Sequence, residues 1–257
     1  MRYQSTTQEE VDNAIELTVG LWLMIYMGPS NSDIFLGVGR WHIDWPNHMS
    51  LAQVLDANFE TSPLPPVVRG EQFPKDLNVY NLERIGGFQI MWTSSLKNHL
   101  AFDEETMTIV LYHFATVLDL HEKNDEQHSI LPDGLAEETR RTLALLLPPF
   151  DVQSKRWYQQ ARKRANGVLD GTATTRSLGP RGREIDSFRF WQRRLVAIAE
   201  AFDNAEPRGF KAWWFDRRNG VQWTNFWLAM TVLMVTAVFG MISAITGIIQ
   251  VYYAARA

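Results

Sequence analysis

FWLAMTVLMVTAVFGMISAITGIIQV, residues 226–251, is an apolar run long enough to cross a membrane as one helix. Crossing the hydrocarbon core takes about 20 apolar residues in a helix, and residues 219–255 contain no charged side chain. Aromatic rings with a polar edge favour both membrane interfaces, and here they flank the run as Trp223, Trp227, Tyr252 and Tyr253. The sequence therefore predicts one transmembrane helix over residues 223–252. The alternative is a buried helix of a soluble protein, which seldom combines this length with aromatic residues at both ends.

The charges beside this helix predict its orientation. Four basic residues precede it, opposed by Glu206 and Asp216, whereas only Arg256 follows it. Lysine and arginine are retained on the cytoplasmic side of a membrane. We therefore expect a cytoplasmic N-terminal body and a short C-terminal tail across the membrane. The basic residues expected to face lipid headgroups are Arg208, Lys211, Arg217 and Arg218.

Small residues recur on one side of the same helix. At 3.6 residues per turn, positions 240, 243, 244 and 247 share a face. Small side chains let two backbones approach closely in lipid, where no hydrophobic force drives association. The pattern predicts a helix-pairing face made of Gly240, Ser243, Ala244 and Gly247. A single-pass helix that never associates is the alternative.

A second apolar stretch, AIELTVGLWLMIYM, covers residues 14–27. It is short for a membrane span and contains Glu16. It also follows acidic residues, where a signal peptide carries positive charge. We interpret it as a buried helix of the body. Membrane insertion then depends on the last helix alone, which is the layout of a tail-anchored protein.

Composition and charge divide the remaining chain. The 257 residues include no cysteine, which excludes disulfides, thiolate catalysis and cysteine-ligated metals. Residues 1–150 hold 21 acidic and 9 basic side chains, whereas residues 151–257 hold 8 acidic and 16 basic ones. We predict an acidic head domain over 1–150 and a basic juxtamembrane region over 151–218. Anionic lipid headgroups are the expected partner of the basic region and nucleic acid is the less favoured one. For residues 155–164, a merely solvated helix face is a further alternative.

Local patterns predict an α+β head. Helices are expected over residues 7–27, 50–59 (capped by Ser50), 136–147 and 155–165, and from Asp186 or Ser187 to about Ala205. Strands are expected at WHIDW, residues 41–45, around Ile90 and Trp92, and over 106–112, with a helix following to His121. Residues 167–183 lack an apolar period and are predicted to be a linker. The first two strands are each followed by a serine and a short helix, which indicates either a duplication or, more simply, convergent capping.

Catalytic signatures are missing from the sequence. It contains no phosphate-binding glycine loop, nucleophile elbow or zinc-protease motif. One cluster, His121, Glu122, Asp125, Glu126 and His128, resembles metal ligands, but a solvated loop explains it better. An acid–base group of His42, Asp44, His48 and His99 is likewise less favoured than ordinary surface positions. We therefore expect no cofactor, metal or catalytic residue.

Several runs taken together resemble a known group of proteins. They are AIELTVGLWLM, SLAQVLDANF, WTSSLKNHLAFDEE, LAEETRRTLALLLP, FWQRRLVAIAEAFDNAEPR and WWFDRRNGVQWTNFWLAM. Their order is similar to that in uncharacterised proteins of filamentous fungi with a C-terminal membrane helix. The resemblance covers most of the chain and is most specific over residues 190–226. It implies a fungal membrane protein and carries over no catalytic residues; longer relatives leave open a further N-terminal part.

Two functions are compatible with these patterns. The leading hypothesis is a cytoplasmic scaffold or adaptor held at a membrane, because a tether is present and catalytic motifs are not. The alternative is a membrane-tethered enzyme with an unrecognised site in the head domain. An exposed apolar patch would favour the adaptor, whereas a deep pocket with converging titratable groups would favour the enzyme.

Overall fold

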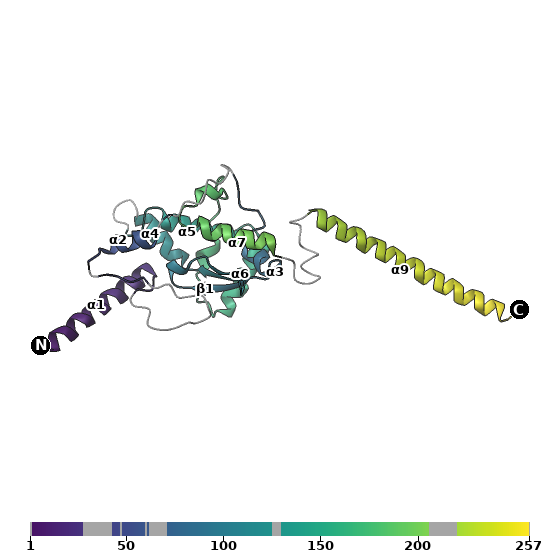
Figure 1. Ribbon diagram of the computed structural model, residues 1–257, viewed down its shortest axis with the longest axis horizontal. Helices are drawn as coiled ribbons and strands as arrows, with labels where there is room; N and C mark the ends of the chain where they lie inside the picture. The colour runs from purple at the N-terminus through teal and green to yellow at the C-terminus, as the bar shows by residue number, and fades with distance from the viewer. Residues whose placement is uncertain are drawn as a thin grey trace. The chain divides into compact units, whose positions relative to one another are not determined.

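The computed structural model describes residues 2–27, 43–46, 48–59, 61, 71–124, 130–205 and 220–256. The chain divides into two compact units, Met1–Glu206 and Pro207–Ala257. We call the first unit the head, and the second contains the helix α9 (Gly220–Ala254). The head combines helices with a small sheet (Figure 1), so the predicted α+β class is confirmed.

Three short strands form the sheet: β1 (Gln89–Thr93), β2 (Ala101–Asp103) and β3 (Thr108–Tyr112). β3 lies in the middle, parallel to β1 and antiparallel to β2. The register places Ile90 opposite Ile109 and Trp92 opposite Leu111. All residues of β3 are buried, as expected for a central strand that reads as a continuous apolar run. The strands predicted around Ile90 and over 106–112 are thus confirmed.

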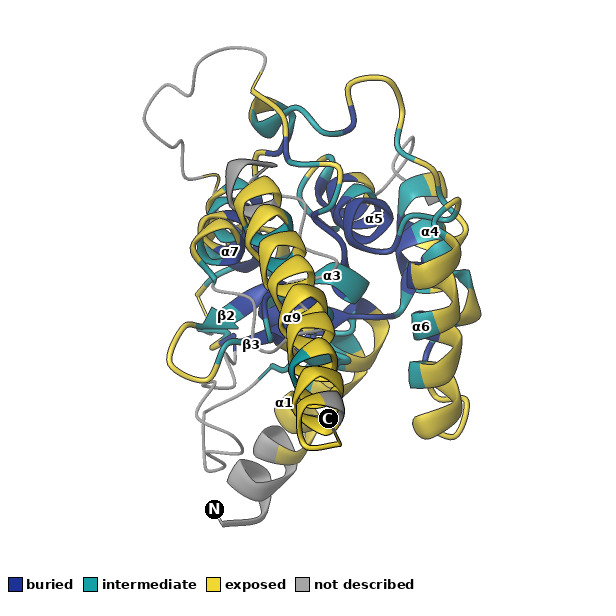
Figure 2. Cartoon of the chain, turned by 90° about the vertical axis from the view of Figure 1, so that its right-hand side faces the viewer, coloured by how far each residue is buried: buried dark blue, intermediate teal, exposed yellow. Residues whose placement is uncertain are grey.

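Helices surround this sheet. Their bounds in the described part of the head are α1 (Arg2–Leu23), α2 (Leu51–Asn58), α3 (Val79–Arg84), α4 (Ala115–Asn124), α5 (Leu135–Leu146), α6 (Val152–Arg164) and α7 (Gln192–Asn204), with 3-10 turns η1 (Leu96–Asn98), η2 (Gly171–Thr174) and η3 (Ile185–Ser187). Figures 1 and 2 show α5 and α7 on the same side of the sheet. Burial is greatest at α5 and at the central strand β3 (Figure 2).

α5 is the central helix of the head. Its leucines are fully buried, as the sequence pattern predicts for residues 136–147. Its Arg140 is also buried, and this guanidinium donates two hydrogen bonds to Asp119, of 2.6 and 3.1 Å. A third bond of 3.2 Å goes to the carbonyl oxygen of Thr172. A charge inside a core needs this degree of pairing, because water no longer solvates it.

The cap predicted at Ser50 is confirmed. The Ser50 hydroxyl accepts a bond from the Gln53 backbone N–H, and the Gln53 side chain accepts one from the Ser50 N–H. This reciprocal pair is a capping box. The second half of the suggested duplication differs, because Ser95 makes no such cap and only the 3-10 turn η1 follows it. The two segments therefore do not form equivalent strand–helix units.

The predicted burial of residues 14–27 is wrong for most of that stretch. α1 ends at Leu23, and the next residue, Met24, has a positive φ of 51°. Leu23 and Ile25 are buried. Earlier along α1, Val11, Ile15, Leu17, Leu21 and Trp22 are exposed. Figure 1 shows the N-terminal end of α1 extending away from the sheet. An apolar helical period indicates that one face of the helix packs against apolar partners, but those partners need not belong to the same domain.

The WHIDW strand is also not formed as predicted. Residues 41 and 42 lie outside the described residues, and Ile43 makes a single parallel bridge with Met27. The Ile43 N–H donates to the carbonyl oxygen of Tyr26 over 2.9 Å. Pro46 follows directly after Trp45, the last residue of WHIDW, and has no N–H with which to extend a ladder.

The head continues beyond residue 150, which is the boundary predicted from the sequence. α6 and α7 contribute buried residues, including Tyr158, Leu195 and Phe202, to the core of the head. The predicted linker over 167–183 also packs against the head, because Leu169 and Ala173 are buried and the Phe73 N–H donates to the carbonyl oxygen of Arg183. Isolated apolar residues in a turn-rich segment give no period, which is why the pattern indicated a linker.

Candidate membrane anchor and sites in the head

α9 has the length and composition of a transmembrane helix. Within its stretch Thr224–Tyr252, the most apolar window of 18 residues has a mean hydropathy of 2.3, and none of that window is buried. The hydroxyls of Thr231 and Thr236 each donate to the carbonyl oxygen four residues earlier over 2.8 Å, and Thr246 does the same. Polar groups in hydrocarbon must be satisfied internally. α9 therefore meets this requirement at Thr231, Thr236 and Thr246.

The aromatic residues predicted at the two membrane interfaces are described in part. Trp227 packs against Phe226 with ring centroids 6.1 Å apart. At the other end, Arg256 donates to the Tyr252 hydroxyl over 2.7 Å, and its guanidinium lies over the Tyr252 ring. The side chains of Trp223 and Tyr253 lie outside the described residues, as do Arg208, Lys211, Arg217 and Arg218.

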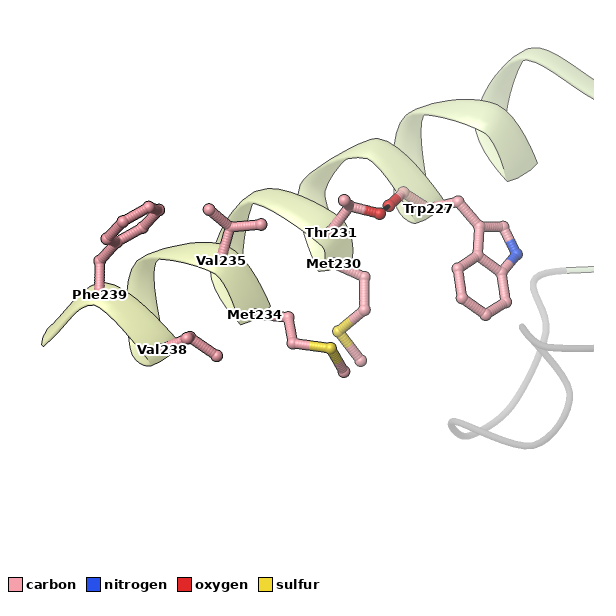
Figure 3. Close-up of a pocket in the computed structure, with 7 residues that line it drawn as sticks. All are labelled: Trp227, Met230, Thr231, Met234, Val235, Val238 and Phe239. Atoms are coloured by element: carbon pink, nitrogen blue, oxygen red, sulfur yellow. Dashed lines mark hydrogen bonds between the residues drawn. The ribbon is translucent and has the colours of Figure 1, made fainter. Parts of the chain in front are cut away.

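Small and large residues occupy opposite faces of α9. A Cβ built on Gly240 or Gly247 meets no atom within 4 Å, so the predicted helix-pairing face is open. Across the helix, large side chains frame a shallow groove of about 330 Å³ (Figure 3), lined by Trp227, Met230, Thr231, Met234, Val235, Val238 and Phe239. Pairing through Gly240, Ser243, Ala244 and Gly247 stays a prediction. It is contradicted if Gly240→Ile leaves self-association of α9 unchanged in a membrane two-hybrid assay.

A buried hydrogen-bond network joins the sheet to α5 and α7. The Tyr112 N–H donates to His99 Nδ1 over 3.2 Å, so Nε2 carries the proton and donates to Thr142 over 2.6 Å. Thr142 donates in turn to the Thr139 carbonyl oxygen, and Trp191 Nε1 donates to the Thr139 hydroxyl over 2.8 Å. Both ring nitrogens of His99 are occupied, so this histidine has a structural role.

Burial fixes the protonation state of His99. The ring is fully buried and lies near Arg194, and these two causes lower its pKa to about 3. An unfolded chain protonates the same histidine near pH 6.5. Because the folded pKa is depressed, stability is complete above pH 6.5 and is lost as the pH falls toward 3. By pH 5 the loss from His99 alone is about 2 kcal/mol.

We therefore expect His99→Gln to flatten the acid dependence of unfolding. Losing the buried bonds destabilises the variant at pH 7 by about 1–3 kcal/mol. Between pH 6.5 and 5, however, it should lose about 2 kcal/mol less than the wild type does. Denaturant unfolding of the detergent-solubilised protein measures both effects, with the exposed His48→Gln as the control. Equal losses in His99→Gln and the wild type would contradict a buried neutral ring.

The carboxyl ends of β1 and β3 are packed with aromatic and polar side chains. Asp170 accepts bonds from the backbone N–H groups of Thr116 (2.6 Å) and Thr172 (2.9 Å). Burial raises the pKa of Asp170, but these bonds outweigh it and leave the pKa below its usual value. Nearby, the His113 ring stacks on Phe114 with centroids 4.0 Å apart, and burial lowers its pKa. Open α/β sheets bind ligands at this edge, but here side chains fill it.

The metal and acid–base groups weighed from the sequence are not assembled in the described part of the chain. Residues 125–129 lie outside it, Glu122 pairs with Arg176, and His121 is buried beside Trp22. No group of three or more potential metal ligands occurs among the described residues. His42 also lies outside them, whereas Asp44 and His48 are exposed and His99 is enclosed in the core.

A surface pocket of about 780 Å³ lies beside the segment predicted to be a linker. Its charged lining residues are Glu137, Arg141, Arg176, Arg181, Glu184 and Asp186. All three of its arginines have partners: Arg176 pairs with Glu122, Arg181 pairs with Glu184, and Arg141 donates to Ser187. Sequence reasoning missed this pocket, because it forms only when residues 176–187 fold back onto α5. Its charges balance, so it indicates no particular reaction.

No protein-family model, curated protein or solved structure matches the chain. The resemblance to the fungal group therefore stays a prediction.

Proposed function

We propose that the protein is a tail-anchored adaptor or scaffold, with α9 across the membrane and the head in the cytoplasm. The exposed apolar length of α9 and its satisfied threonines support the anchor. The excess of basic residues before α9 supports the orientation.

The adaptor role rests on one observation, the exposed apolar face of α1. Leu17 and Leu21 are 65% and 64% exposed, and Val11, Ile15 and Trp22 extend this apolar surface along the helix. Large apolar patches on a soluble surface mark interaction sites. The helix also carries exposed Glu10 and Asp12, which an anionic membrane would repel. The partner that fits is a protein with an apolar groove that accepts a helix face.

Proximity labelling from the head of the full-length protein tests this role. Leu17→Glu with Leu21→Glu places two charges in the α1 face and is expected to reduce labelling of head-dependent neighbours about tenfold or more. Ala52→Glu with Ala57→Glu adds the same charge at exposed positions of α2, outside this face, and serves as the control. The adaptor role is wrong if both double variants label the same proteins as the wild type while remaining in the membrane.

A further inference from the structure

α6 has two different faces. Ser154 and Tyr158 are buried, and the Tyr158 hydroxyl donates to the Asp170 carbonyl oxygen over 2.6 Å, which fixes this side against the head. On the opposite side, positions three or four apart form one exposed stripe, composed of Val152, Lys155, Arg156, Gln159 and Lys163. We call this stripe the outer face of α6; α6 lies at the edge of the head in Figure 2.

The cations of the outer face are not neutralised within the described part of the head. No carboxylate there forms an ion pair with Lys155, Arg156 or Lys163. Three acidic residues close to α6 bind other groups. Asp151 accepts bonds from the Gln153 N–H and the Ser154 hydroxyl, Asp170 binds Thr116 and Thr172, and Glu83 accepts a bond from Trp157. The outer face therefore presents net positive charge.

Exposed apolar side chains flank the same helix. Phe150, just before α6, is 85% exposed, and Val168, just after it, is 68% exposed. Val152, in the first turn, is also exposed. Apart from these three residues, the large apolar side chains exposed in the described head are Leu120 and those of α1. A basic helix with apolar residues at its ends can bind headgroups through its cations and insert the apolar groups among the lipid chains.

We propose that the outer face of α6 docks the head onto anionic lipid headgroups of the membrane in which α9 is anchored. The inference rests on the proposed anchor, which keeps the bilayer close to the head. Residues 206–219 connect Ala205 to the start of α9 and can span at most roughly 50 Å, so α6 stays within reach of the surface. Each juxtamembrane cation strengthens the association by about fivefold. The tether favours lipid over nucleic acid, because it raises the effective concentration of headgroups.

The chain has no cysteine, so one introduced thiol can report on this contact. The full-length Gln159→Cys protein, labelled with a fluorophore, is reconstituted in phosphatidylcholine vesicles with or without phosphatidylserine. Both preparations contain a lipid that bears a quencher at the headgroup. We expect strong quenching with phosphatidylserine and little without it, and high salt should reduce the quenching. A label on the exposed Ala57→Cys of α2 should be quenched weakly in both.

Charge reversal provides the decisive comparison. Lys155→Glu with Arg156→Glu should reduce the ratio of docked to undocked heads more than 25-fold, and quenching should fall to the level in neutral vesicles. Lys75→Glu with Arg193→Glu changes the net charge equally at exposed positions outside α6 and should leave quenching intact. Similar quenching in both vesicle types overturns the proposal, as does equal loss in the two double variants. The proposal is also overturned if the fluorescence of the label responds to added RNA but not to phosphatidylserine. Failure of the protein to float with either vesicle would instead contradict the anchor.

Discussion

Deletion of residues 220–257 is expected to move the protein from the carbonate-resistant membrane pellet to the soluble fraction almost completely. A helix with the apolar length of Thr224–Tyr252 inserts in a way that is effectively irreversible. The headgroup binding proposed for α6 would be salt-sensitive and would not survive carbonate. Cell fractionation followed by carbonate extraction measures the change.

Replacement of residues 224–252 by a leucine-rich helix of equal length is the matched control. It should restore the pelleted fraction, because anchoring depends on apolar length and not on the identity of the residues. Retention of the truncated chain in the pellet would contradict an anchor formed by α9 alone. It would point to residues 14–23, whose apolar side chains are largely exposed on α1.

Glu138→Ala is expected to cause a large loss of stability in the head. The buried Glu138 carboxylate accepts three bonds of 2.8 Å from the backbone N–H groups of Arg189, Phe190 and Trp191, at the start of α7. Burial raises the pKa of Glu138, and these bonds together with Arg141 act against that rise. Alanine leaves three backbone donors without an acceptor, of which that of Trp191 is buried and those of Arg189 and Phe190 are partly buried. We expect a loss of about 3–5 kcal/mol, or roughly 10 °C in Tm for a head of this size.

Two further variants separate this capping role from a simple loss of charge. Glu138→Gln keeps one carbonyl oxygen, which can still accept the two bonds that Oε1 accepts from Phe190 and Trp191, so its loss should be smaller. The adjacent Glu137 is exposed, and Glu137→Ala should change stability by no more than about 0.5 kcal/mol. Thermal unfolding in detergent compares the three. If Glu138→Ala unfolds at the same temperature as Glu137→Ala, the carboxylate does not hold α7.

Local sequence patterns were sufficient to predict the structural features whose determinants lie within one segment of the chain. The apolar length of α9, the cap at Ser50 and the leucines of α5 each depend on residues a few positions apart. The start of α7 was less predictable. The sequence indicated a helix from Asp186 or Ser187, whereas α7 begins at Gln192. The N–H groups of residues 189–191 are bound by Glu138, about fifty positions earlier in the chain, and no local pattern reveals such a contact.

Burial and surface charge were harder to predict than helices. The apolar stretch of residues 14–27 predicted a core helix, because periodicity shows that a face is apolar but not what covers it. The basic residues of α6 were evident in the sequence. The structure was needed to show that these basic residues are separated from the carboxylates, which face inward or bind other groups. The α1 face and the outer face of α6, which carry the functional proposals, both depend on this information.

Protease protection tests the central claim most directly, namely that α9 crosses the membrane once with the head on the cytoplasmic side. Sealed vesicles with their cytoplasmic face outward are treated with protease, using the full-length protein with a tag after Ala257 and an antibody against the head. We predict that the head is digested while a small tagged fragment containing α9 survives until detergent is added. A protected head with a digested tag would contradict the orientation. Digestion of both without detergent would contradict a membrane-spanning α9.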